Sequence, residues 1–137
     1  MSYEFLDHTA DVKFRAEGSS IEEVFSFSAD AMNETIRGDI SIVEQRAVTF
    51  DVEGKDLEEL LYNFLEEFLF LLDAEDFLVS SVKEIEVNEK SFELKVVVVG
   101  DSAKNYKFTN DVKAVTYSEM KVYEKSGKFF SEVVLDV

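Results

Sequence analysis

The sequence contains no cysteine, proline or tryptophan, and its only histidine is His8. The lack of cysteine excludes disulfide bonds, thiolate metal sites and cysteine nucleophiles, and it fits a reducing compartment. One histidine cannot build a histidine-rich zinc site, and no nucleophile elbow accompanies it for Ser-His-Asp catalysis. The 5 glycines are not clustered, so the sequence has no phosphate-binding loop. These absences remove the common signatures of a hydrolase or nucleotide-binding enzyme.

Basic residues are also scarce. The chain has 14 Lys and Arg against 30 Asp and Glu, a net charge of −16. Residues 1–82 hold 20 of the acidic groups and only 5 of the basic ones. A field of this sign repels phosphate backbones, so we expect no autonomous binding of RNA or DNA. The acidic surface would attract a basic protein or cations, although simple solubility explains it as well.

Long hydrophobic runs are missing. The longest, Phe68–Leu72 and Val96–Val99, are too short to cross a bilayer. The first residues, MSYEFLDH, lack the basic and apolar regions of a signal peptide. We therefore expect a cytoplasmic protein without membrane contact. The length of 137 residues, 46% of them hydrophobic, suits one domain that covers 1–137.

Two segments have helical periodicity. Ser20 and Glu23 have the spacing of a capping box, and apolar residues then recur at steps of three and four until Gly38. A second helix over 57–75 is predicted to begin after Asp56, with a wide stripe of leucine and phenylalanine facing the core. Its other face carries polar side chains that we expect to be solvated: Glu58, Glu59, Asn63, Glu66 and Glu67.

The remaining segments alternate as strands do. Links at 88–90 and 124–128 suit hairpins, the second because Gly127 can take a positive φ. The β-branched run Lys95–Val99 is typical of a central strand buried on both faces. The predicted fold class is α+β: two helices packed on a largely antiparallel β-sheet in a single compact domain. The predicted strands are Val12–Ala16, Val43–Val52, Lys83–Val87, Ser91–Val99, Ala114–Tyr123 and Phe129–Val137.

The stretch Asp7-His8-Thr9-Ala10-Asp11 places the only histidine between carboxylates. In one interpretation, Asp7 and Thr9 bond to the local backbone and order the turn into the first predicted strand. In the other, His8 and Asp11 supply metal ligands or an acid–base pair. The five residues alone leave both interpretations open.

Three further segments give this stretch a context. The sequence reads YEFLDHTADVKFRAEG over 3–18, DVKAVTYSEMKVYE over 111–124 and VVLDV over 133–137. In these motifs and their spacing, and in the helix LEELLYNFLEEFLFLLDAE over 57–75, the chain resembles the archease family from end to end. Archeases are small acidic accessory proteins of the tRNA-splicing RNA ligase.

The resemblance implies a function without catalysis by this chain itself. The partner ligase joins RNA ends with GTP and divalent metal, through a guanylylated histidine. An archease accelerates this guanylylation and permits repeated turnover. The implied partner is thus the tRNA-splicing RNA ligase, and the implied class is a cofactor protein, not an enzyme.

The resemblance also implies site residues. Asp11 and Asp136 match the family's metal site, and Lys113 opens the KAVTY motif. His8 belongs to the same motif as Asp11. Oxygen ligands suit calcium, magnesium or manganese more than zinc, and the carboxylate of Val137 would add another oxygen. Ser118 follows KAVTY where some members have histidine, which leaves the role of this position open.

Two other functions remain as alternatives. One is a general chaperone or modulator of RNA-modifying enzymes, which would bind several clients with little dependence on Asp11. The other is a free-standing metal-dependent enzyme that uses His8 as its base and the aspartates as ligands, and it would turn over substrate without a partner.

Overall fold

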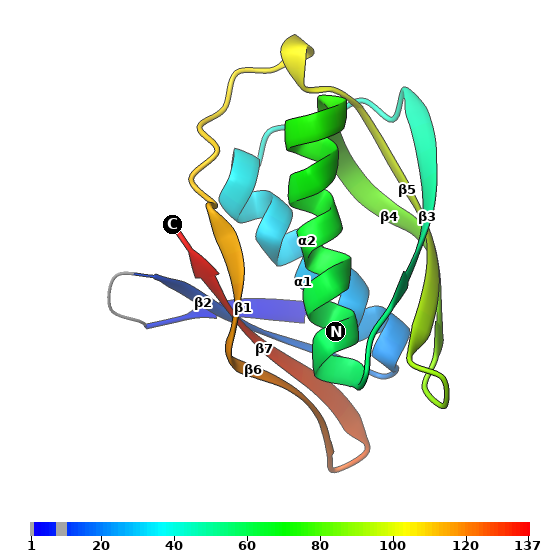
Figure 1. Ribbon diagram of the computed structural model, residues 1–137. Helices are drawn as coiled ribbons and strands as arrows, with labels where there is room; N and C mark the ends of the chain where they lie inside the picture. Colours follow the sequence, from blue (N-terminus) through cyan, green and yellow to red (C-terminus); the bar gives the residue numbers. More distant parts are fainter. Residues whose placement is uncertain (1, 8–10) are drawn as a thin grey trace.

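The computed structural model describes residues 2–7 and 11–137. Two helices and seven strands follow one another in a mixed order, with one short 3-10 turn, Ala103–Asn105, near the end of the fifth strand (Figure 1). The elements are β1 (Ser2–Leu6), β2 (Val12–Gly18), α1 (Ile21–Arg37), β3 (Arg46–Glu53), α2 (Leu57–Glu75), β4 (Phe77–Asn88), β5 (Glu93–Ser102), β6 (Ala114–Lys125) and β7 (Lys128–Asp136).

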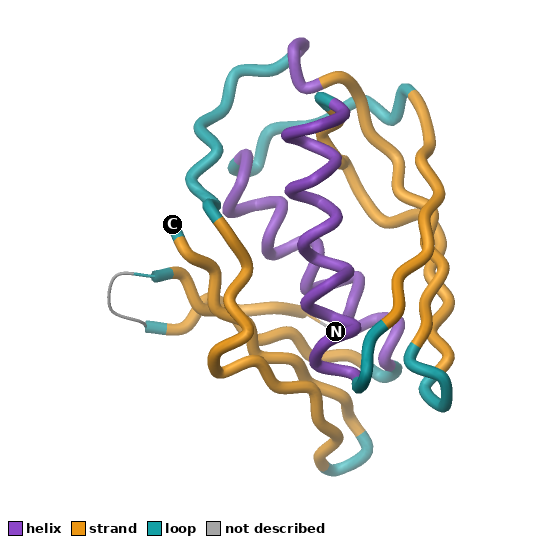
Figure 2. The backbone as a smooth tube through the Cα atoms, in the orientation of Figure 1, coloured by secondary structure: helices purple, strands orange, loops and turns teal. Residues whose placement is uncertain are grey.

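The strands form two antiparallel sheets, and the two helices lie between them (Figures 1 and 2). One sheet has the order β1-β2-β7-β6, and the other has the order β3-β5-β4. Helix α1 packs on β2, β7 and β4, while α2 packs on β6, β4 and β3. The predicted α+β class with two helices on antiparallel strands is confirmed. The division into two sheets was not predicted, because alternation within a strand does not reveal its neighbours.

The core is rich in phenylalanine and joins both sheets to the helices. Phe25 of α1 stacks on Phe64 of α2 with their ring centroids 5.9 Å apart, and Phe64 meets Phe68 edge to face at 5.1 Å. Phe50 of β3 packs against both α2 rings. Phe14 of β2 is fully buried on the opposite side.

None of the helices in the described part of the chain is long and apolar enough to span a membrane.

The helix ends follow the capping signals in the sequence. The Glu23 N–H donates to Oγ of Ser20 at 3.1 Å, and α1 ends at Gly38, whose φ is 72°. The Glu59 N–H donates to Oδ1 of Asp56 at 2.8 Å. These interactions satisfy backbone groups that the first turn of a helix leaves without a partner.

The polar face of α2 is only in part the solvated surface that its pattern predicts, because its side chains are half-buried and three of them bind the neighbouring strands. The Val122 N–H donates to Oε2 of Glu58 at 3.0 Å, and the Val115 N–H donates to Oε2 of Glu66 at 3.3 Å. Nδ2 of Asn63 donates to the carbonyl of Glu53 at 2.8 Å. Strands β6 and β3 are sheet edges, and their outward backbone groups need partners. Helix α2 therefore supplies side chains to one edge of each sheet.

Side chains of helix α1 also bind the backbone of β4, the other edge strand of the three-stranded sheet. Its Glu22 accepts from the Val87 N–H at 3.1 Å. At the other end of the helix, Arg37 donates to the carbonyls of Val79 and Ser80, both at 3.1 Å. Burial lowers the pKa of Arg37, and the nearby Asp30 opposes that change. The guanidinium thus ties the end of α1 to the start of β4.

Several strand predictions need correction. Strand β1 was not predicted at all, because SYEFL is short and its burial does not alternate cleanly. Strand β5 is the central strand, as predicted, but its outer face is buried only in part: Lys95 is exposed, Val97 is half-buried and Val99 is buried. Strand β3 begins at Arg46, not at Val43, whose side chain is 58% exposed.

A test of this packing is the substitution Gly100→Ala in β5. A Cβ at this position would overlap the carbonyl oxygen of Leu78 in the neighbouring strand and lie 2.9 Å from the Phe77 ring. We expect the change to lower the free energy of unfolding by about 2 to 3 kcal/mol, as overpacking does. Urea denaturation measures this loss. The control Lys95→Ala, at an exposed position on the same strand, should stay within about 0.5 kcal/mol; equal effects would contradict the packing.

Candidate functional site

Strand β7 pairs with β2 on one edge and with β6 on the other, and this places the predicted site residues. Val12 lies opposite Leu135, so continuing the antiparallel register by one residue brings Asp11 next to Asp136. On the other side, Ala114 lies opposite Asp136. The start of β2, the start of β6 and the end of β7 therefore meet at one end of the four-stranded sheet, close to the C-terminus (Figure 1).

Lys113 joins this end of the sheet through its backbone. Its N–H donates to the carbonyl of Asp136 at 2.7 Å, directly before β6 begins. Lys113 and Val137 line one surface hollow of about 390 Å³, together with Val12 of β2. The side chains of Lys113 and Asp136 are exposed, and Asp11 is half-buried. Four of the five sequence-predicted residues, Asp11, Lys113, Asp136 and Val137, thus lie at one end of the four-stranded sheet. Asp11 and Asp136 are not among the residues that line the hollow.

His8 lies outside the described residues, as do Thr9 and Ala10, so both interpretations of the DHTAD stretch stay open at these positions. In the described part of the chain, no group of three or more His, Cys, Asp or Glu side chains is arranged to hold a metal ion. The metal site predicted from Asp11, Asp136 and Val137 therefore stays a prediction.

The chemistry of the residues present fits a hard cation. Asp11 and Asp136 offer carboxylate oxygens from neighbouring strands, and the exposed position of Asp136 leaves room for water. Calcium takes about six to eight oxygen ligands, and magnesium keeps several waters. Two carboxylates would supply only part of such a set, so main-chain oxygens, water or a partner protein would have to complete it.

Three residues of the hollow were not predicted from the sequence. Thr35 lines it from α1, and Asn110 and Asp111 line it from the segment that leads into β6. Oδ1 of Asn110 accepts from the Val112 N–H at 3.2 Å, which orders the turn before Lys113. The pair Asn-Asp before KAVTY is a turn signal in the sequence, but nothing local to it indicates that the turn faces the chain's last residue.

The sequence matches the model of the Archease protein family over residues 3–137. The chain belongs to the archease family. It is 34% identical to the archease of Pyrococcus abyssi over 139 residues, with 98% of each chain covered. It is also 34% identical to an archease-like protein of Drosophila melanogaster, covering 100% of this chain and 91% of the other.

Solved structures of the family share the fold. The solution structure of a Methanobacterium thermoautotrophicum protein is 32% identical, covers 99% of both chains and superposes with a TM-score of 0.76. A crystal structure from Thermotoga maritima, described as an archease and possible chaperone, is 21% identical with a TM-score of 0.67. At that identity, the second structure shows the fold alone.

Ser118, the position where some archeases have histidine, lies in an irregular part of β6. The pairing with β7 shifts between Thr116 and Lys121, and Glu119 has a positive φ of 63°. The Ser118 side chain is exposed, and its carbonyl accepts from Oγ1 of Thr116 at 3.3 Å. Ser118 therefore lies on the strand that Lys113 precedes, but beyond its first regular pairing with β7.

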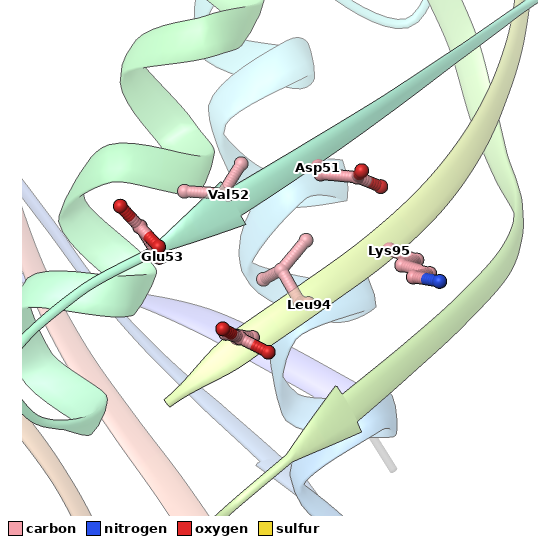
Figure 3. Close-up of a pocket in the computed structure, with 6 residues that line it drawn as sticks. Asp51, Val52, Glu53, Leu94 and Lys95 are labelled. Atoms are coloured by element: carbon pink, nitrogen blue, oxygen red, sulfur yellow. The ribbon is translucent and has the colours of Figure 1, made fainter. Parts of the chain in front are cut away.

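A second hollow of about 390 Å³ lies on the outer face of the three-stranded sheet (Figure 3). Asp51 and Glu53 of β3 and Glu93 and Lys95 of β5 line it, and all four side chains are exposed. Sequence alternation does place these residues on one face, but the pairing of β3 with β5 was needed to bring them together. This face is an exposed and mostly acidic surface. It belongs to the three-stranded sheet, whereas Asp136 lies in the four-stranded sheet.

Cation binding at the predicted site has a consequence for stability. We expect calcium, magnesium or manganese at 10 to 100 times the Kd to raise the free energy of unfolding by about 1.4 to 2.7 kcal/mol, because the folded state alone forms the site. Thermal unfolding with each chloride salt and with chelator measures this gain. Asp11→Asn and Asp136→Asn should lose it, whereas Asp73→Asn, at an exposed position in the last turn of α2, should keep it. If both site variants keep the cation-dependent gain in stability, the Asp11 and Asp136 carboxylates are not the ligands.

Proposed function

We propose that this protein activates a GTP-dependent RNA ligase of tRNA splicing or RNA repair, by promoting its guanylylation and repeated turnover. In this proposal the chain is an accessory protein, and the chemistry belongs to the ligase. Membership of the archease family supports it. The observation that carries it is the convergence of Asp11, Lys113 and Asp136 at one end of the four-stranded sheet.

Each site residue has a role in the proposal. Asp11 and Asp136, with Val137 as a third candidate, would hold calcium, magnesium or manganese, and His8 would act in the same motif as Asp11. A bound cation would supply positive charge near the phosphates that the ligase handles. Lys113, exposed at the same end of the sheet, would contact a phosphate or balance the aspartates. The strand pairing holds Asp11, Lys113 and Asp136 at one end of the four-stranded sheet, where a partner could reach them.

Charge supports a docking role. An RNA ligase has to hold a phosphate-rich substrate and therefore presents basic surface near its active site. This chain carries a net charge of −16, and exposed carboxylates gather on the outer face of the three-stranded sheet. Such complementary fields speed association and weaken as salt rises. The proposed partner is cytoplasmic, and we propose the same location for this chain.

A general chaperone or modulator is the second candidate, because the archease family model that matches this chain includes the Thermotoga maritima protein described as a possible chaperone. It differs from ligase activation in one respect that can be measured. A chaperone that binds several clients does not need Asp11, Lys113 and Asp136 to lie together.

The proposal predicts the outcome of multiple-turnover ligation by the cognate ligase with GTP and manganese. The natural protein should raise the yield of joined RNA well beyond one turnover per ligase. Asp11→Ala, Asp136→Ala and Lys113→Ala should each lower that activation by about 10-fold or more, since the loss of even an outer-shell partner of a metal ligand typically costs about 10- to 100-fold. Circular dichroism checks that these exposed or half-buried positions leave the fold intact.

The control in the same assay is Asp73→Ala, which removes one exposed carboxylate outside the proposed site and outside the hollow and should keep full activation. Full activation by the Asp11 and Asp136 variants would defeat the assignment of the site. Absence of activation by the natural protein at any ratio would favour the chaperone candidate instead.

A further inference from the structure

Glu66 of helix α2 binds the backbone at the start of strand β6. The hydrogen bond from the Val115 N–H to the Glu66 carboxylate is called the clamp below. Val115 is the second residue of β6, and β6 is the outer strand of its sheet. The Val115 N–H points away from β7 and donates to Oε2 of Glu66 at 3.3 Å. Val115 is only 3% exposed, so this amide has little access to water. Without the carboxylate, a buried donor would lack an acceptor, which costs more than an ordinary exposed bond.

The Glu66 carboxylate is itself held in place. The Tyr62 hydroxyl, one turn earlier on α2, donates to Oε1 of Glu66 at 3.5 Å. The Tyr62 ring packs edge to face on Tyr117 of β6, with the centroids 5.8 Å apart. Both oxygens of Glu66 are thus engaged, one by its own helix and one by the strand. A carboxylate fixed in this way sets where the strand can lie relative to the helix.

The clamp is next to the proposed site. Lys113 is two residues before Val115, and the Lys113 N–H donates to the Asp136 carbonyl at 2.7 Å. Residues 106–113 before it have no helix or strand structure, so pairing starts only at Ala114. The short segment from Lys113 to Val115 is therefore held from two sides: β7 binds its first amide, and α2 binds its last.

We propose that Glu66 is a positioning residue for ligase activation: by binding the Val115 amide, it fixes the start of β6 and so holds Lys113 beside Asp136. Glu66 touches neither a cation nor a substrate in this role. The inference rests on the proposed function for its meaning, but the clamp itself is a property of the isolated chain and can be tested without the ligase.

The same helix provides a matched control. Glu58 accepts from the Val122 N–H at 3.0 Å, which is the same kind of bond between α2 and the same strand. Val122 lies beyond the irregular pairing between Thr116 and Lys121, away from Lys113. Loss of Glu58 should cost stability in a similar way but leave the start of β6 in place.

The test compares Glu66→Ala, Glu66→Gln and Glu58→Ala by amide hydrogen exchange and by multiple-turnover ligation. In Glu66→Ala we expect exchange at Val115 and Lys113 to become about five- to tenfold faster, as the loss of one hydrogen bond permits. Activation of the ligase should fall by a similar factor. Glu66→Gln retains an acceptor oxygen and should restore both. Glu58→Ala should speed exchange at Val122 alone and keep activation.

Each other outcome overturns a defined part of the proposal. Unchanged exchange at Lys113 in Glu66→Ala would show that Glu66 does not hold the start of β6. Equal loss of activation in Glu58→Ala would show that Glu66 only stabilises the fold in general. If Glu66→Ala does not fold, the shorter Glu66→Asp, which keeps the charge but not the reach, takes its place with the same expectations. If the natural protein fails to activate the ligase while the exchange result holds, the proposed function fails and the clamp stands.

Discussion

The pairing of β7 with both of its neighbours is the constraint on which the functional end of this molecule depends. Residues far apart in the sequence reach one place only because β2 runs along one edge of β7 and β6 along the other. Asp11 precedes β2, Lys113 precedes β6, and Asp136 ends β7. A buried contact anchors the same strand to the helical layer, since the hydroxyls of Ser28 and Ser131 lie 2.8 Å apart. Main-chain hydrogen bonds between the strands therefore set the geometry of the site.

The helices complete this arrangement, because their polar side chains form hydrogen bonds with the backbone of the edge strands. An open sheet leaves outward backbone groups on its outer strands, and here polar side chains of α1 and α2 bind several of them. The helical layer thus does more than bury apolar area. It fixes the position of each sheet relative to the helices, and through Glu66 it reaches the start of β6, next to Lys113. The sequence alone suggests that the acidic residues serve solubility. At these positions, glutamate side chains also accept hydrogen bonds from strand amides.

Local signals in the sequence predicted the local structure well. The caps at Ser20 and Asp56 and the turn at Gly127, with φ of 78°, depend on neighbouring residues only. The two-sheet topology, strand β1 and the edge contacts of Glu58 and Glu66 were not predictable in this way, because they depend on segments distant in the sequence. For the site, the family resemblance supplied Asp11, Lys113 and Asp136, and the strand register then brought them together. Asn110 and Asp111 have no signal in the sequence that connects them to Val137.

In the proposed function, this protein binds a cation and acts at the end of the four-stranded sheet around Asp136. Paramagnetic broadening by manganese tests it most directly, because the metal reports its own position in the amide spectrum of the isolated chain. At low manganese concentration the account predicts that the signals of Val12, Lys113 and Asp136 are lost first, and that Asp136→Asn prevents the loss. Broadening centred on Asp51, Glu53 and Glu93, on the outer face of the other sheet, would contradict it.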